Sequence, residues 1–360
     1  MDIQTIAMIA KVALIVVVLL QVVPIMVWVE RRGSALMQNR LGPNRVGPLG
    51  LIQSLADVIK FFFKEDSVPG HVNKFYYILA PLVALVPAFM TFAVIPFASE
   101  LKFGDETVRL QIASLDVGLL YILSITSLGV YGIMMAGWAS NNKYAMFGAL
   151  RSSAQMISYE LSMGLSIIGI VMTFSTVDLW EIANAQGQTL LQLGPISIPK
   201  WGIFFQPIGF LIFLTATYAE TNRLPFDLPE GESEIVAGYH LEYGSMKFAL
   251  FFMAEYINMT VASAFVSTLY FGGWQMLPGM SLILNQISTD STYYQWIKVL
   301  LEGSSFAIKV GFFMWLFVWV RWTLPRFRYD QLMDLGWKIM LPLSLINVFV
   351  TGVLIFYKVI

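Results

Sequence analysis

The chain has 360 residues, of which 57% are hydrophobic and only 12% are charged. Because charged residues make up about a quarter of a typical soluble domain, this composition excludes a soluble or disordered protein and predicts an all-α polytopic membrane protein. The 22 basic and 23 acidic residues nearly balance and leave no basic excess for nucleic acid. There is no cysteine, which excludes disulfides and iron–sulfur ligation within the chain. We expect no metal ion and no covalently bound cofactor here.

The apolar runs predict one membrane domain over residues 1–360 with about eight transmembrane helices. The first run lacks the basic start and the cleavage site of a secretory signal, so we interpret it as a retained span. The other runs are also near the length of about 20 residues that crosses a bilayer. The predicted spans are about 5–29, 74–98, 113–139, 154–177, 200–219, 247–275, 296–320 and 337–357.

The segment 49–63 has the apolar period of a helix but is too short and too charged to span. Gln53, Ser54, Asp57 and Lys60 occupy its polar face. This pattern predicts an amphipathic helix that lies in the membrane interface. A docking helix covered by a partner protein is the alternative, and both can hold together.

Basic residues are concentrated in one set of connections. Fifteen of the 22 lie in or beside 30–74, 140–153, 220–247 and 321–338, whereas five lie in the opposite set. The positive-inside rule places the first set in the cytoplasm or matrix. Both termini are then expected on the outer, periplasmic side.

The connection 220–246 is acidic and breaks this positive-inside trend. Its single arginine, Arg223, accompanies several carboxylates, and interleaved prolines indicate an ordered loop. A solvated acidic face is the alternative interpretation. This connection holds six of the chain's 23 acidic residues, which are Glu220, Asp227, Glu230, Glu232, Glu234 and Glu242.

Two glutamates are predicted within spans. Glu160 and Glu255 each lie about eight residues from a cytoplasmic end, which is roughly 12 Å deep at 1.5 Å per residue. Charges at that depth usually face a polar interior, and carboxylates in such places can carry protons. A structural hydrogen bond or ion pair is the alternative for each. Glu302 and Lys309 share a face of another predicted helix and fit an internal ion pair as well as a functional role.

Several motifs together carry a family resemblance. They are Glu30-Arg31-Arg32, the run Arg40 to Gly47, Arg151 to Glu160, Ala219 to Glu234, Ala254-Glu255-Tyr256 and Pro325 to Asp330. With these motifs the chain resembles the quinone-site membrane subunit of respiratory complex I, the NADH-quinone oxidoreductase. The resemblance covers nearly the whole chain.

The resemblance implies a helical membrane protein with ordered cytoplasmic loops that borders a quinone tunnel and couples quinone reduction to proton translocation. It implies a tunnel near Arg31, Arg40, Asp57, Lys60, Phe251 and Phe252. It implies a proton relay through Glu160, Glu220, Glu230, Glu232, Glu234, Glu242 and Glu255, with Tyr159, Arg151, Arg223 and Asp227 as polar partners.

The same resemblance implies quinone as the substrate, while FMN, iron–sulfur clusters and NADH are held by partner subunits. The implied partners are the hydrophilic-arm iron–sulfur subunits, small membrane subunits, antiporter-like membrane subunits and the lipid bilayer. The sequence favours the inner membrane of a bacterial cell over that of a mitochondrion. Two alternatives stay open at this point: the membrane anchor of a related energy-converting hydrogenase, and a stand-alone ion transporter with its site at broken helices.

Overall fold

A computed structural model describes residues 3–103, 106–193, 196–228, 236–284 and 293–358, and helices dominate it. Within these residues, seven helices are long and apolar enough to cross a membrane. The predicted class, an all-α polytopic membrane protein, is confirmed. The long helices are α1 (Ile3–Met37), α3 (Lys74–Thr91), α4 (Gly118–Ala139), α5 (Lys143–Phe174), α10 (Ser245–Tyr270), α12 (Tyr294–Thr323) and α14 (Leu341–Phe356).

Shorter elements fill the connections. Helix α14 is continuous with α13 through one π-helical turn, η4. Two antiparallel hairpins, which the sequence did not predict, are formed by β1 with β2 and by β3 with β4. The short helices are α2 (Gln53–Phe63), α6 (Leu179–Ala185), α7 (Gly202–Phe205), α8 (Pro207–Glu220), α11 (Ser281–Leu284) and α13 (Tyr329–Asp334). The turns and strands are η1 (Pro48–Gly50), η2 (Phe92–Val94), η3 (Gly238–His240), η4 (Leu335–Met340), β1 (Glu100–Phe103), β2 (Glu106–Arg109), β3 (Thr189–Leu193) and β4 (Ile196–Pro199).

Several helices differ from the predicted segments. Helix α1 continues to Met37, past the predicted end at 29, so that Glu30, Arg31 and Arg32 are helical, and α3 ends at Thr91 rather than at 98. Helix α5 begins at Lys143, well before residue 154, because the Asn142 side chain caps it by accepting a hydrogen bond from the Tyr144 amide. The segment 200–219 is not one helix: α7 ends at Phe205, and α8 starts at Pro207 as a separate helix of 14 residues. Proline favours the first position of a helix because it needs no amide partner there.

Helix α2 starts four residues later than the predicted 49–63. The chain before it turns sharply at Gly47 and Gly50, whose φ angles are 73° and 74°. A Cβ at Gly50 would lie 2.3 Å from the Pro43 carbonyl carbon, so only glycine fits this close approach. The apolar side chains of α2, including Leu55, Ile59 and Phe62, are exposed in the isolated chain, as an interfacial helix requires.

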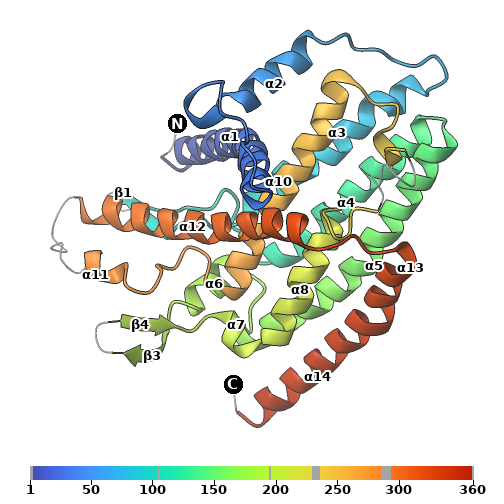
Figure 1. The fold of residues 1–360 in the computed structure, drawn as a ribbon. Coiled ribbons are helices and arrows are strands. Elements are labelled where there is room, and N and C mark those ends of the chain that lie inside the picture. Colours follow the sequence, from blue (N-terminus) through green and yellow to red (C-terminus); the bar gives the residue numbers. More distant parts are fainter. Residues whose placement is uncertain (1–2, 104–105, 194–195, 229–235, 285–292, 359–360) are drawn as a thin grey trace.

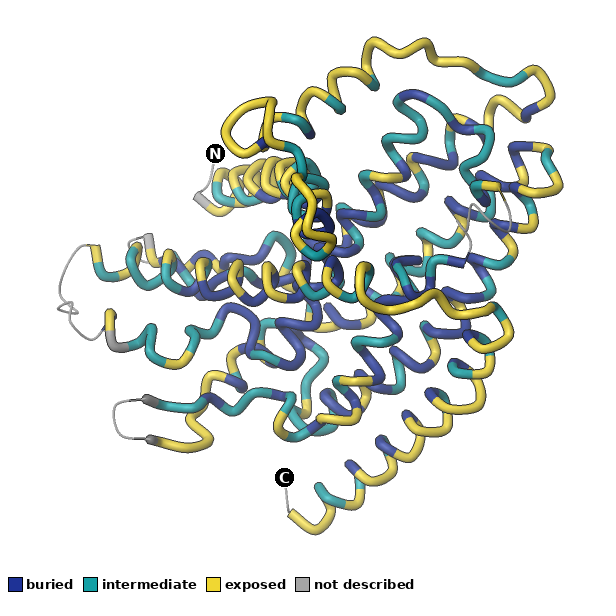
Figure 2. The backbone as a smooth tube through the Cα atoms, in the orientation of Figure 1, coloured by how far each residue is buried: buried dark blue, intermediate teal, exposed yellow. Residues whose placement is uncertain are grey.

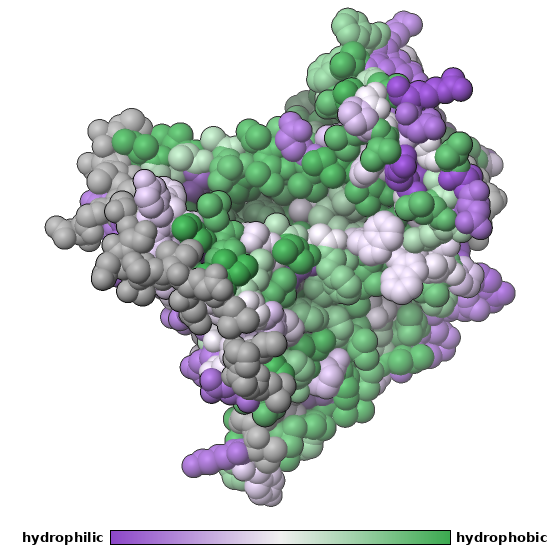
Figure 3. All heavy atoms as spheres, turned by 60° about the vertical axis from the view of Figure 1, so that its left-hand side comes forward, coloured by the Kyte–Doolittle hydropathy of each residue, from purple (hydrophilic) through white to green (hydrophobic). Residues whose placement is uncertain are grey.

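Helix α10 runs through the middle of the molecule and packs against α1, α3, α8 and α12. It is the most buried of the long helices, whereas the N-terminal half of α1 and one face of α14 are exposed (Figure 2). Hydrophobic side chains cover much of the face shown in Figure 3. The β3–β4 hairpin and the start of α12 lie at one end of the bundle, and α2 and α13 lie toward the other (Figure 1).

Close packing of α3 on α4 depends on a small residue. A Cβ at Gly132 would lie 2.6 Å from the Ala84 amide nitrogen, whereas a Cβ at Gly129, one turn away, meets nothing within 4 Å. We therefore expect Gly132→Ala to destabilise the protein by about 1–3 kcal/mol through overpacking. Thermal denaturation of the detergent-extracted protein measures this. Gly129→Ala is the matched control, and equal melting temperatures for the two variants would contradict the packing argument.

Candidate functional site

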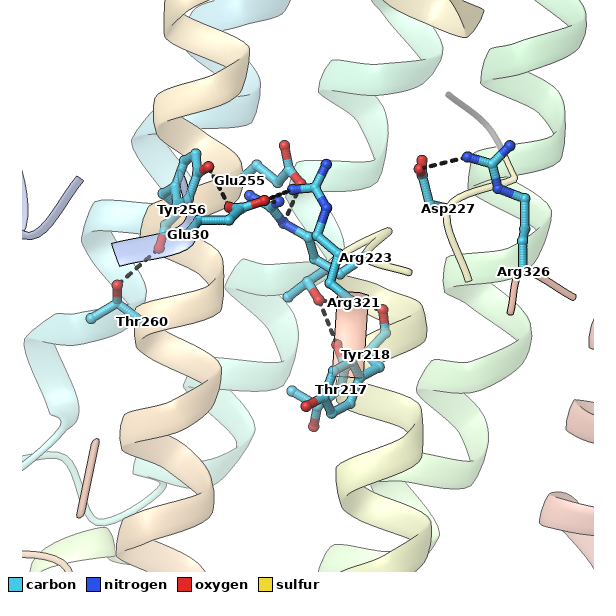
Figure 4. A network of polar contacts seen from close by, with 11 residues as sticks. Glu30, Thr217, Tyr218, Arg223, Asp227, Glu255, Tyr256, Thr260, Arg321 and Arg326 are labelled. Carbon is cyan, nitrogen blue, oxygen red and sulfur yellow. Dashed lines mark hydrogen bonds and ion pairs between the residues drawn. The ribbon is translucent and has the colours of Figure 1, made fainter. Parts of the chain in front are cut away.

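A cluster of four charged side chains lies where four segments meet; Glu30 and Arg223 are buried, and Glu255 and Arg321 are partly buried. Arg223 Nε is 2.6 Å from Glu255 Oε1, and Arg223 Nη1 is 3.4 Å from Glu30 Oε2. Arg321 donates to the other oxygen of Glu30, and the Tyr256 hydroxyl donates to Glu30 Oε2 at 2.7 Å. Figure 4 shows these groups pointing toward one another. We call Glu30, Arg223, Glu255 and Arg321 the ion cluster.

The ion cluster joins parts of the chain that are far apart in sequence. Glu30 lies near the end of α1, Glu255 lies within α10, and Arg321 lies in the last turn of α12. Arg223 follows the C-terminal end of α8 and is held at 5% exposure, with its guanidinium 4.5 Å from the centre of the Tyr256 ring. The two carboxylates balance the two guanidinium groups, which is the condition under which buried charges are tolerated.

The connection after α8 also carries Asp227, which is beside the cluster and pairs with Arg326 at 3.1 Å. Burial raises the pKa of Asp227 above its usual value, although Arg326, Arg321 and Arg223 oppose that effect. Burial alone would lower the pKa of Arg223, but Glu255, Tyr256 and Glu30 outweigh it and raise the pKa above its ordinary value. Arg223 is therefore a permanent positive charge.

Two cavities lie on either side of the ion cluster. The inner cavity has a volume of about 70 Å³, enough for several water molecules, and Glu220 and Glu255 line it together with Thr126, Asn258 and Phe251. The side cavity is larger, at about 520 Å³, and is within the range of small-molecule sites. Its lining includes Glu30, Arg31, Arg40, Phe252, Tyr256 and Arg321.

The inner cavity is where the predicted intramembrane carboxylates approach one another. The Glu220 carboxylate is hydrogen-bonded by Thr126 and interacts electrostatically with Glu160. The Ser127 hydroxyl in turn donates to Glu160. Glu255 on α10 and Glu220 on α8 therefore line the same cavity, and Glu160 on α5 interacts with Glu220.

The residues implied for a quinone tunnel separate into different environments. Arg31, Arg40 and Phe252 line the side cavity, but Phe251 is buried and faces the inner cavity. Successive helical residues point about 100° apart, so these two neighbours cannot line the same wall. At the α2 end, Asp57 pairs with Arg31 at 2.5 Å, and Lys60 is exposed.

Other predicted relay residues lie at the edges of this arrangement. The buried Tyr159 hydroxyl donates to the Leu332 carbonyl at 2.8 Å, and Arg151 lies 5.5 Å from the centre of the Tyr329 ring. Glu242 accepts from Asn142 at 2.8 Å and lies 3.7 Å from His71 Nε2. Three predicted residues lie outside the described parts of the chain: Glu230, Glu232 and Glu234.

His240 lies beside Glu242 in the turn that precedes α10, and its ring packs against Tyr239 and Phe248. Burial lowers the pKa of His240 from 6.5 to about 4. Between these two pH values the unfolded chain binds a proton at His240 and the folded chain does not. The contribution of the neutral His240 ring to the free energy of unfolding is therefore complete above pH 6.5 and is lost as the pH falls toward 4.

We expect His240→Phe to keep the ring contacts and to reduce the fall in melting temperature between about pH 7 and about pH 5. The measurement is thermal denaturation of the detergent-extracted protein at both values. His71→Gln is the control, because the His71 side chain is 49% exposed. If the melting temperature of His240→Phe fell with pH as much as that of the wild type, His240 would not be the cause of the loss of stability at low pH.

Two members of the ion cluster, Glu30 and Arg321, were not among the predicted site residues, and neither was Tyr256, which donates to Glu30. The sequence does mark Glu30 as a candidate site residue, because it is a carboxylate directly at the end of a long apolar run, next to two arginines. Within the described residues, no group of three or more His, Asp or Glu side chains is arranged to hold a metal ion.

The fold and this site define a helical membrane protein built around a buried ion cluster between two cavities. The chain belongs to the NADH dehydrogenase family, whose sequence model matches residues 9–352.

Curated relatives agree with this family over almost the full chain, and each of the following carries the name of an NADH-quinone oxidoreductase subunit. The relative from Bdellovibrio bacteriovorus is 47% identical, covering 96% of this chain and 95% of the relative. The relative from Cytophaga hutchinsonii is 48% identical, covering 90% of each. The relative from Koribacter versatilis is also 48% identical, covering 97% and 96%. The chain is thus a multi-pass membrane subunit of an NADH-quinone oxidoreductase.

Proposed function

We propose that this chain borders the passage by which quinone reaches its reduction site, and that it couples quinone reduction to proton movement. One observation carries the proposal: the ion cluster is the wall between the two cavities. Glu30, Tyr256 and Arg321 face the side cavity, whereas Glu255 faces the inner cavity. Arg223 joins the two sides by pairing with both Glu30 and Glu255.

The coupling follows from the charge balance of the cluster. A quinone that gains electrons takes up protons, and the developing negative charge attracts the Arg321 guanidinium away from Glu30. Glu30 then competes more strongly for Arg223, which weakens the hold of Arg223 on Glu255. With its counter-charge withdrawn, Glu255 gains affinity for a proton from the inner cavity, and Glu220 and Glu160 respond in turn.

The same proposal assigns the sides of the membrane and the partners. The side cavity lies at the C-terminal ends of α1 and α12, on the side where most basic residues lie, so the hydrophilic-arm iron–sulfur subunits dock there. FMN and NADH are bound in that arm. Small and antiporter-like membrane subunits receive the protons beyond Glu160. The segment of α7 and α8 crosses the membrane as an eighth, broken span beside the seven long helices, so both termini face the periplasmic side of a bacterial inner membrane.

The names of the relatives favour this function over a hydrogenase anchor or a stand-alone transporter, because they are subunits of NADH-quinone oxidoreductases. Purification of the tagged chain in mild detergent separates the three. Co-purification of flavin- and iron–sulfur-bearing subunits supports the proposal, and a nickel–iron hydrogenase, or a folded chain alone, contradicts it.

Quinone passage through the side cavity is tested at Phe252, which is 38% exposed there. We expect Phe252→Trp to narrow the cavity and raise the KM for a long-chain quinone about tenfold, a loss of about 1.4 kcal/mol, with a smaller change in kcat. The measurement is steady-state NADH:quinone reductase activity of the complex. Phe312→Trp, on the exposed face of α12, is the control, and an unchanged KM in Phe252→Trp would contradict the passage.

A further inference from the structure

Aromatic rings fill the interior between the inner cavity and the opposite end of the bundle. Phe213 and Phe265 line the cavity, and their ring centres are 5.3 Å apart. Phe213 contacts Tyr270 at 5.6 Å, and Tyr270 contacts Phe210 at 5.5 Å. Phe210 and Phe313 both pack on Phe271, at 5.6 and 5.2 Å. We call this set the aromatic plug: Phe210, Phe213, Phe265, Tyr270, Phe271 and Phe313.

The plug is built from three helices and is largely buried. Its members come from α8, from the end of α10 with the residue that follows it, and from α12. Phe213 and Tyr270 have no exposed surface, Phe265 and Phe313 are 4% and 2% exposed, and Phe210 and Phe271 are partly buried. Closely packed rings leave little room for a file of water molecules.

A lysine lies at the far end of the plug. Trp201 contacts Phe271 at 5.6 Å, and Lys309 Nζ lies 5.6 Å from the centre of the Trp201 ring. The same Nζ donates to the carbonyls of Gly273 and Gln275, at 2.9 and 2.6 Å. Two carbonyls and a ring face are the partners that suit an ammonium group.

The sequence left open an ion pair between Lys309 and Glu302, but these two side chains do not pair in the structure. Glu302 accepts from the Ser99 amide at 2.9 Å and lies 3.7 Å from Lys298, and within the described residues Lys309 makes no ion pair with a carboxylate. Its ammonium group is therefore held by the two carbonyls and the Trp201 ring, without a carboxylate partner at this level of α12.

The loop that supplies the carbonyls is itself fixed. Gln186 Oε1 accepts from the amides of Gly202 and Gly272, both at 2.9 Å, and its amide donates to the Thr268 carbonyl at 3.0 Å. These bonds use both ends of the Gln186 side-chain amide and three backbone groups. The loop and the lysine are held as one rigid cap.

We propose that the aromatic plug and Lys309 form a proton barrier that closes the inner cavity toward the outer side of the membrane. The plug excludes a water chain, and the protonated form of Lys309 repels a hydrated proton, as cations do in other selective pores. This inference rests on the proposed function, because only a cavity that receives protons needs such a barrier. Protons in the cavity then leave sideways, through the carboxylates, rather than across the subunit.

The test is passive proton flux into liposomes that contain the purified complex, without NADH, under an imposed potassium diffusion potential. We expect Lys309→Met and Phe313→Ala each to raise the flux about tenfold, which corresponds to about 1.4 kcal/mol off the barrier. NADH:quinone reductase activity should persist in both. Phe312→Ala is the matched control, because Phe312 directly precedes Phe313 in α12 but is 59% exposed.

Phe271→Leu keeps the position apolar and serves if Phe313→Ala fails to assemble. The barrier would be overturned if the flux stayed at the wild-type level in active complexes with Lys309→Met and also in active complexes with one of the plug variants, Phe313→Ala or Phe271→Leu. Adding Glu255→Gln to a leaky variant separates this inference from the relay. If the leak falls, protons reach the plug through Glu255. If the leak persists at full size, the barrier stands and the relay through Glu255 is wrong.

Discussion

Replacement of Arg223 by methionine is expected to be the most damaging single change in the chain. Arg223 is 5% exposed and pairs with both Glu30 and Glu255. Removal of one partner leaves a buried carboxylate without its counter-charge, which costs about 3–5 kcal/mol. Glu30 keeps Arg321, so the loss falls mainly on Glu255. We expect little assembled complex and no quinone reductase activity from what remains.

A second substitution distinguishes lost charge balance from lost packing. In Arg223→Met/Glu255→Gln the orphaned carboxylate becomes neutral, so the double variant should assemble better than Arg223→Met alone. The measurements are the yield and the melting temperature of the complex in detergent. Arg328→Met is the control, because the Arg328–Asp330 pair is exposed, and it should cause no measurable loss. Additive losses in the double variant would show that the two residues are not energetically coupled.

The architecture could be predicted because hydropathy and helix period are local properties. Every predicted span contains helix, and the amphipathic pattern of 49–63 marks α2. The exceptions have local causes that outweigh hydropathy. Gly47 and Gly50 delay α2, Asn142 caps α5 early, and Pro207 separates α8 from α7.

The site was predictable only where one segment carried the signal. Arg223 and Glu255 were identified from charges in unusual surroundings, and they are in direct contact. The contact between Glu30 and Arg223, by contrast, joins residues that are 193 positions apart in the sequence. Nothing in either segment indicates which helix faces which. Phe251 and Phe252 are different, since helical geometry alone indicates that neighbours face different walls.

The residue Glu220 offers the most direct test of the proposed proton relay. It lies at the end of α8, lines the inner cavity with Glu255, and interacts with Thr126 and Glu160. Because a glutamine has the same shape but cannot transfer a proton, Glu220→Gln should leave the complex assembled. Side chains that transfer protons contribute about a hundredfold or more to rate. We expect quinone reductase activity and proton pumping to fall together by about that factor.

The two activities must be measured on the same preparation for the comparison to be decisive. NADH oxidation with quinone and acidification of inverted membrane vesicles give the rate and the proton yield, and Glu220→Asp should restore part of both. Glu181→Gln is the matched control, because Glu181 is exposed on α6 and hydrogen-bonds Thr176. A Glu220→Gln complex with full activity and full pumping would remove Glu220 from the relay. Lost pumping with full quinone reduction would place Glu220 downstream of the coupling step, since quinone would then be reduced without a proton passing through Glu220.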